Sequence, residues 1–147
     1  MSLKHRLLED MKAAMKEKDT VRKNTIQMVR SAVLQVEKDS KVNLEDDGII
    51  EVVAKEVKKR RDSLPDYEKS GRQDLVETLN YEIEVLMKYL PEQLADEELE
   101  KIIKQVILDT GAESAKDIGK VMKEIMPKIK GKADGKIVNQ IVRKYLN

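Results

Sequence analysis

The sequence predicts an all-α protein with a four-helix N-terminal lobe and a small three-helix C-terminal lobe. Lys, Glu, Asp, Leu, Ile, Val and Met supply most of the 147 residues, and the unbranched side chains among them lose little rotamer freedom in a helix. Apolar residues recur at three- and four-residue spacing along most of the chain. Phe, Trp and Cys are absent and only 3 prolines occur, so we expect an aliphatic core and few helix breaks.

The first two helices follow from apolar periodicity and one capping residue. A stripe that begins at Leu3 predicts a helix to about Lys18. Asp19 then caps a second helix, because its carboxylate can accept hydrogen bonds from the free N–H groups of the next turn. The polar stretch 38–47 is expected to form a loop.

Two further helices complete the first lobe. The third begins near Gly48 and continues past Pro65, with a kink near residues 62–64, because the proline ring removes one helical hydrogen bond. Gly71 suits a left-handed C-cap, and a fourth helix spans roughly Gln73 to Leu90. Pro91 disfavours helical geometry at Leu90, which predicts a first domain of residues 1–90 and a second of 91–147.

Three shorter helices are expected in the second lobe. Asp96 caps the first, which ends at Thr110-Gly111; Asp117 caps the second, with a break near Pro127. Asp134 caps the third. Its apolar stripe consists of Ile137, Val138, Ile141, Val142 and Tyr145.

Charge is unevenly distributed in this second lobe. Residues 115–147 contain nine Lys or Arg and three acids, whereas residues 91–114 contain two Lys and seven acids. Such segregation within a short lobe predicts one positive and one negative face.

Few residues support catalysis or metal chemistry. The segment from Gly131 to Lys136 lacks the spacing and hydroxyl residue of a P-loop. With His5 as the single histidine and no Cys, a transition metal has few ligands, and the acids at 45–47 suit a loop and helix start better than a calcium site. We therefore expect no catalytic residue, no metal and no cofactor. No apolar run reaches the length of a membrane span, and no signal or transit peptide is evident, so a cytoplasmic protein without a membrane contact is expected.

The strongest candidate site is the basic glycine turn. Several lysines project from a short segment that contains two glycines, and glycine permits close approach of a polyanion backbone. The N–H groups that open the next helix also favour anions. A folded RNA suits this surface better than a single strand, because exposed aromatic platforms are scarce. The candidate RNA-binding residues are Gly119, Lys120, Lys123, Lys128, Lys130, Gly131, Lys132, Lys136, Arg143 and Lys144. The second basic run, 58–61, is expected to pair with Glu56 and Asp62 on its own helix.

Three stretches of the chain are distinctive: Met11-Lys-Ala-Ala-Met-Lys16, Tyr89-Leu-Pro-Glu-Gln-Leu94, and Ile118-Gly-Lys-Val-Met-Lys123 with Lys130-Gly-Lys-Ala-Asp-Gly-Lys136. They resemble the YqeY family, and the second lobe resembles the tail domain of the B subunit of the tRNA-dependent Asp/Glu amidotransferase. The resemblance implies two linked helical subdomains and a second lobe similar to a tRNA-contacting appendage. The amidotransferase tails commonly carry Asn-Pro where this chain has Asp134-Gly135, which adds a negative charge to the surface. The catalytic cradle of the amidotransferase has no counterpart here.

The leading hypothesis is a non-catalytic helical protein that binds tRNA or another structured RNA through the basic glycine turn. One alternative is an adaptor that docks on an amidotransferase or an aminoacyl-tRNA synthetase through acids at 97, 98 and 100. Another is an accessory to carbon–nitrogen ligase activity with glutamine as amide donor, which family membership suggests and no residue of this chain supports.

Overall fold

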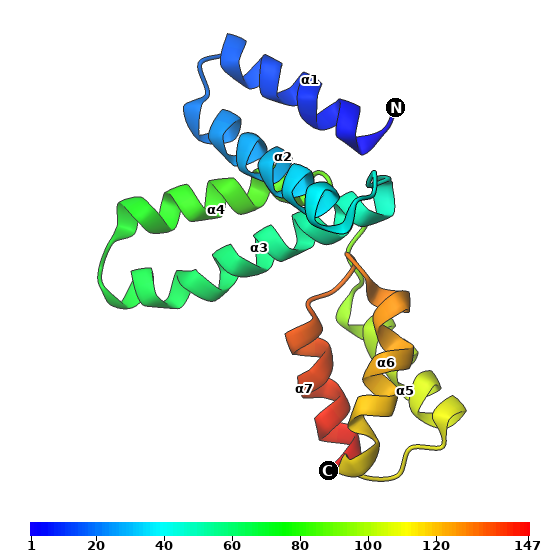
Figure 1. Ribbon diagram of the computed structural model, residues 1–147. Helices are drawn as coiled ribbons and strands as arrows, with labels where there is room; N and C mark the ends of the chain where they lie inside the picture. Colours follow the sequence, from blue (N-terminus) through cyan, green and yellow to red (C-terminus); the bar gives the residue numbers. More distant parts are fainter. The chain divides into compact units, whose positions relative to one another are not determined.

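Seven α-helices and one short 3-10 helix make up the computed structural model, which describes all 147 residues (Figure 1). No strand is present, so the predicted all-α class with four helices followed by three is confirmed. The chain forms two compact units, which we call unit 1 (Met1–Leu90) and unit 2 (Pro91–Asn147). None of the helices combines the length and the apolar character needed to cross a lipid bilayer.

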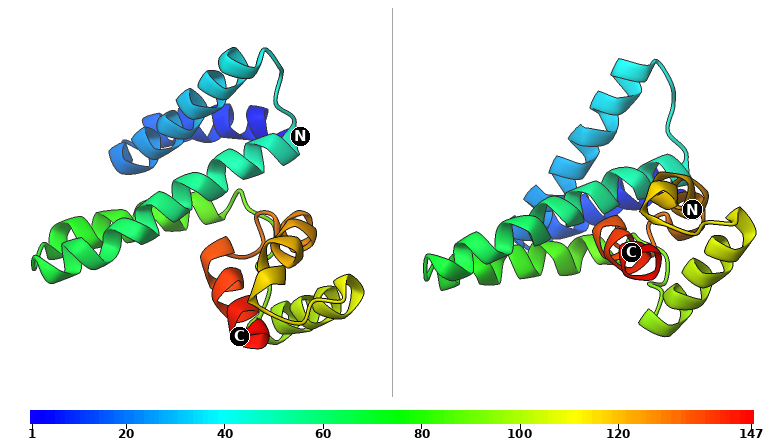
Figure 2. Two further views of the ribbon diagram at one scale, coloured as in Figure 1. Left: turned by 60° about the horizontal axis from the view of Figure 1, so that its bottom comes forward. Right: turned by 90° about the horizontal axis from the view of Figure 1, so that it is seen from below.

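Unit 1 contains α1 (Leu3–Lys16), α2 (Thr20–Ser40), α3 (Asp46–Lys69) and α4 (Gln73–Met87). Helix α1 lies along α2, while α3 and α4 form an antiparallel hairpin (Figures 1 and 2). Helix α2 contacts the other three helices. The fully buried side chains at the centre are aliphatic, as the composition predicts: Leu7, Ile26, Val29, Ile49, Val53 and Leu86.

The ends of these helices follow local rules. The Asp19 carboxylate accepts a hydrogen bond of 3.0 Å from the Arg22 N–H and caps α2 as predicted. Gly71 follows α3 with a φ of 72°, and α3 continues through Pro65. The predicted loop 38–47 is shorter than expected. Helix α2 extends to Ser40, and Lys41 ends it in the left-handed conformation.

Unit 2 contains α5 (Asp96–Thr110), the 3-10 helix η1 (Ala115–Asp117), α6 (Ile118–Ile129) and α7 (Gly135–Leu146). Each of the three α-helices contacts the other two, so they enclose one small core (Figure 1). The buried members of that core are Leu99, Ile103, Val106, Val121, Ile125, Ile129, Val138, Val142 and Leu146.

Three predictions for unit 2 were wrong. Ala95 is the N-cap of α5, and Asp96 stands in the first turn, where its charge still favours the positive end of the helix. Helix α6 does not break at Pro127 but continues to Ile129. Pro127 and Lys123, whose carbonyl loses its helical donor, are both exposed, so water can supply the missing hydrogen bond. Tyr145 and Ile137 lie outside the core with 41% and 47% of their surfaces exposed, because the side of α7 that faces the core is the one that carries Val138, Val142 and Leu146.

Candidate nucleic-acid interface

The glycine turn joins α6 to α7 and has a defined backbone. Gly131 adopts a φ of 73°, in the left-handed region that glycine occupies without a steric penalty. The Lys132 N–H donates to the Ile129 carbonyl at 2.7 Å, and the Ala133 N–H donates to the same oxygen at 3.2 Å. Because the Ile129 side chain is 1% exposed, the turn is anchored directly to the core of unit 2.

The segment before α5 holds the other side of this turn. The Gln93 side-chain amide donates to the Gly131 carbonyl at 2.8 Å and to the Pro91 carbonyl at 2.9 Å. The Leu94 N–H donates to the Lys132 carbonyl at 2.9 Å. Two of the stretches that resemble the YqeY family therefore meet in space. The hydrogen bonds of Gln93 and Leu94 to the turn were not predicted from the sequence, although both residues belong to one of those stretches.

Asp134 closes the turn and starts α7 as predicted. Its carboxylate accepts a hydrogen bond of 2.9 Å from the Lys136 N–H. The carboxylate therefore supplies the anion that the helix N-terminus favours. The earlier expectation that this end of α7 attracts an external phosphate is not supported by the arrangement.

The candidate lysines do not all share one face. At 100° per residue, Lys120 and Lys123 lie about 60° apart on α6, whereas Lys128 is turned by about 140° from Lys123. On α7, Lys136 and Arg143 are separated by seven residues, so they lie about 20° apart along one side. All the candidate lysines, Arg143 and Gly119 are exposed, and Gly131 is half-buried.

Several of these cations have no acidic partner within unit 2. Helix α7 contains no acid, and the Arg143 guanidinium donates to the Asn139 amide oxygen at 2.8 Å. Five exposed lysines form no ion pair: Lys123, Lys128, Lys132, Lys136 and Lys144. Their ammonium groups are available to a polyanion.

Asp117 is an acid of this region with a structural role. Its carboxylate accepts hydrogen bonds from the Glu113 N–H at 2.9 Å and the Ser114 N–H at 3.5 Å. These hydrogen bonds lower the pKa of Asp117 below its ordinary value, and the charges of Lys120 and Lys116 add to the shift. Asp117 forms a capping box with Ser114 around η1. It is also the N-cap residue of α6, as predicted, but its side chain makes no hydrogen bond to α6.

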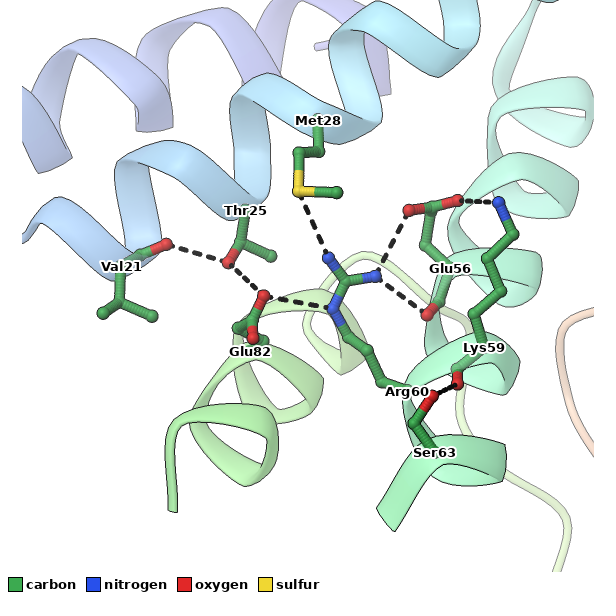
Figure 3. A network of polar contacts seen from close by, with 8 residues as sticks. All are labelled: Val21, Thr25, Met28, Glu56, Lys59, Arg60, Ser63 and Glu82. Atoms are coloured by element: carbon green, nitrogen blue, oxygen red, sulfur yellow. Dashed lines mark hydrogen bonds and ion pairs between the residues drawn. The ribbon is translucent and has the colours of Figure 1, made fainter. Parts of the chain in front are cut away.

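The second basic run is engaged within unit 1, as predicted. Lys58 pairs with Asp62 at 3.4 Å. Arg60 is 6% exposed, and its guanidinium contacts Glu56 at 3.2 Å and Glu82 at 3.3 Å (Figure 3). The sequence did not identify Glu82, because it lies on α4, 22 residues from Arg60.

Other acidic and histidine side chains do not form a second site. Asp46 and Asp47 stand in the first turn of α3, as predicted, but no side chain caps that helix. The Asp46 carboxylate accepts a hydrogen bond of 2.9 Å from the Leu3 N–H at the start of α1. His5 is exposed. No three His, Asp or Glu side chains converge in an arrangement that could hold a metal ion.

Comparison with known proteins identifies the family. The sequence model described as "Yqey-like protein" matches residues 4–146. A protein of Kluyveromyces lactis named "Altered inheritance of mitochondria protein 41, mitochondrial" is 37% identical over 107 residues, which are 70% of this chain and 57% of the relative. A protein of the same name in Lachancea thermotolerans is 35% identical over 57% of this chain and 46% of the relative. Another in Pyrenophora tritici-repentis is 28% identical over 69% of this chain and 58% of the relative. The chain thus spans about half the length of the curated relatives it matches.

These relatives overturn the expected cytoplasmic location, because their names describe them as mitochondrial. The expectation was a default, drawn from the lack of an apolar span and of a recognisable targeting segment. Such absences do not specify a compartment.

Proposed function

The chain belongs to the YqeY family, and from this premise we propose that it is a non-catalytic protein that binds tRNA or another structured RNA through the basic surface of unit 2. We define this surface as Lys120 and Lys123 on α6, Lys132 in the glycine turn, and Lys136, Arg143 and Lys144 on α7. The observation that carries the proposal is a backbone-fixed turn that bears the exposed Lys132, which forms no ion pair, and that continues into a helix without acids.

The chemistry of this surface suits phosphate binding. Each ammonium group that neutralises a phosphate releases a condensed counterion, so affinity comes from the RNA backbone and falls as salt rises. A turn held by Gln93, Leu94 and the buried Ile129 loses little conformational entropy when it binds. Contacts of this kind recognise the shape of a folded RNA.

The test is an anisotropy titration of labelled tRNA at low salt with two charge-matched triple variants. Lys123/Lys132/Lys136→Ala removes three positive charges from the basic surface. Lys38/Lys55/Lys69→Ala removes three exposed lysines from unit 1, none of which forms an ion pair. We expect the first variant to bind at least tenfold more weakly than wild type and the second to bind within about threefold of it.

Equal losses in both variants would mean that net charge alone drives association, which contradicts the proposed surface. A wild-type protein without affinity for tRNA would contradict RNA binding altogether. Because the relatives are named as mitochondrial proteins, tRNA from mitochondria is a suitable second probe beside bulk tRNA.

A second candidate is an adaptor that docks on an amidotransferase or an aminoacyl-tRNA synthetase. It is favoured by Glu97 and Glu98, two exposed acids of the predicted face in the first turn of α5, whereas Glu100 of that face is half-buried. Copurification from cells with and without RNase separates the two functions. A partner that remains after RNase treatment favours the adaptor, and a partner that is lost favours RNA.

A further inference from the structure

Tyr145 presents an aromatic ring at the surface of unit 2. It is 41% exposed, and the ammonium nitrogen of Lys104 on α5 lies 5.6 Å from the centre of its ring. The hydroxyl groups of Tyr81 and Tyr89 donate to Asp19 and Asp10 within unit 1. The Tyr145 hydroxyl, in contrast, makes no hydrogen bond to the rest of the chain.

From this arrangement we infer that Tyr145, with Lys104 beside it, is a stacking site for one unpaired base of the bound RNA. The inference rests on the proposed function and adds to it a site that binds an unpaired nucleotide of the RNA. Aromatic side chains stack on bases of any type, and each such contact contributes about 1–3 kcal/mol. The Lys104 ammonium group supplies a cation for the phosphate or the face of the same nucleotide.

The site and part of the basic surface lie on the same helix, but on different sides of it. Nine residues separate Lys136 from Tyr145, about 13 Å along α7, and they point to opposite sides of the helix. Lys144 lies between them, about 80° from Lys136 and about 100° from Tyr145. Since α7 contains no acid, a polyanion can follow the helix from the glycine turn to the ring without meeting a like charge on it.

Exposed or half-buried apolar side chains on α7 and α5 add apolar surface near the ring. Ile137 is 47% exposed, and Ile141, half-buried, stands one turn before Tyr145. On α5, Leu108 is 75% exposed one turn after Lys104. This mixture of an exposed ring, aliphatic side chains and lysines fits an unpaired base better than a paired stretch, whose bases are already stacked.

The experiment compares tRNA with a fully paired RNA duplex of similar length. For Tyr145→Ala we expect a loss of about 5- to 100-fold in tRNA affinity, with duplex affinity within about twofold of wild type. Tyr145→Phe keeps the ring and should bind tRNA as wild type does. The salt dependence of tRNA binding should not change in Tyr145→Ala, because stacking releases no counterions, whereas the triple lysine variant lowers it.

Normal tRNA affinity of Tyr145→Ala would overturn the stacking site and leave the basic surface intact. An equal loss for tRNA and duplex would also overturn it, because the ring would then act only by supporting α7. If wild type bound neither RNA, both the proposed function and this site would be rejected.

Discussion

The side-chain amide of Gln93 donates a hydrogen bond of 2.8 Å to the carbonyl oxygen of Gly131, 38 residues later in the chain. This contact, with the neighbouring hydrogen bond from the Leu94 N–H to the Lys132 carbonyl, fixes the turn that carries Lys132 and joins the two helices that carry the other cations of the basic surface. The conformation of the turn therefore depends on residues 91–95, which precede α5 and include no Lys or Arg.

Gln93→Ala should loosen the turn without unfolding unit 2. A solvent-exposed hydrogen bond contributes about 0.5–1.5 kcal/mol, so we expect amide exchange at Leu94 to quicken by about 2- to 10-fold. Gln105→Ala is the matched control, since its amide also donates at 2.8 Å but only to Asp109 within α5. Unchanged exchange at Leu94 in Gln93→Ala would show that the turn is held by other contacts.

Two glycines of the candidate site should respond to alanine in opposite directions. Gly131→Ala places a Cβ in the left-handed region and should destabilise unit 2 by about 1 kcal/mol. Gly119 lies inside α6, and a Cβ added there meets no atom within 4 Å. Gly119→Ala should therefore stabilise unit 2 by about 0.4–1 kcal/mol. Urea unfolding followed through the amide signals of unit 2 measures both, and the same sign for both would refute this reading of the turn.

Substitution of the buried Arg60 should destabilise unit 1 far more than substitution of the neighbouring Arg61. Arg60→Met leaves Glu56 and Glu82 without their shared cation and should destabilise unit 1 by about 3 kcal/mol. The exposed Arg61 serves as control, because Arg61→Met should change stability by no more than about 0.5 kcal/mol.

The double variant Arg60→Met/Glu56→Leu tests whether an unpaired charge causes that loss. It should be more stable than Arg60→Met alone, because the buried Glu56 carboxylate, which Arg60→Met leaves only the exposed Lys59 at 3.1 Å, is removed, whereas Glu82 remains in both variants. Urea unfolding followed through unit 1 gives both values. If the double variant were no more stable than Arg60→Met, packing and not charge would explain the effect.

Asp117 should make unit 2 sensitive to acid. Its folded pKa is lowered by the N–H groups of Glu113 and Ser114, so its contribution to stability is present above the unfolded value of about 3.8 and is lost as pH falls through the folded pKa. Asp117→Asn has no ionisable carboxylate and therefore lacks this contribution to stability. The gap in unfolding free energy between wild type and Asp117→Asn should be widest above about pH 5 and should narrow toward about pH 2. A gap that stays constant over this range would contradict the role of the ionised carboxylate.

Local signals in the sequence were sufficient for most of the helix boundaries. Asp19 and Asp134 cap the helices they were expected to cap, because an aspartate oxygen reaches the free N–H groups of the next turn. Gly71 and Gly111 take positive φ values at helix ends, where glycine pays no Cβ penalty. The pairing of Lys58 with Asp62 followed from i,i+4 geometry alone.

Contacts between distant segments could not be predicted. Gln93 and Gly131 show no periodic relation, and nothing in the α4 sequence distinguishes Glu82 as a partner of Arg60. The exposure of Tyr145 has a similar cause. Its position in the apolar stripe of α7 predicts burial, but the side that carries Val138, Val142 and Leu146 faces the core, and which side of a stripe is covered depends on the packing of neighbouring helices.

The salt dependence of tRNA binding tests the central claim most directly. We predict that affinity falls with salt for the wild-type protein, and that Lys123/Lys132/Lys136→Ala lowers the slope of log Kd against log salt by about 2–3, close to one per lost phosphate contact. The control Lys38/Lys55/Lys69→Ala should keep the wild-type slope. A wild-type slope near zero, or the same slope in all three proteins, would contradict a phosphate-binding surface on unit 2.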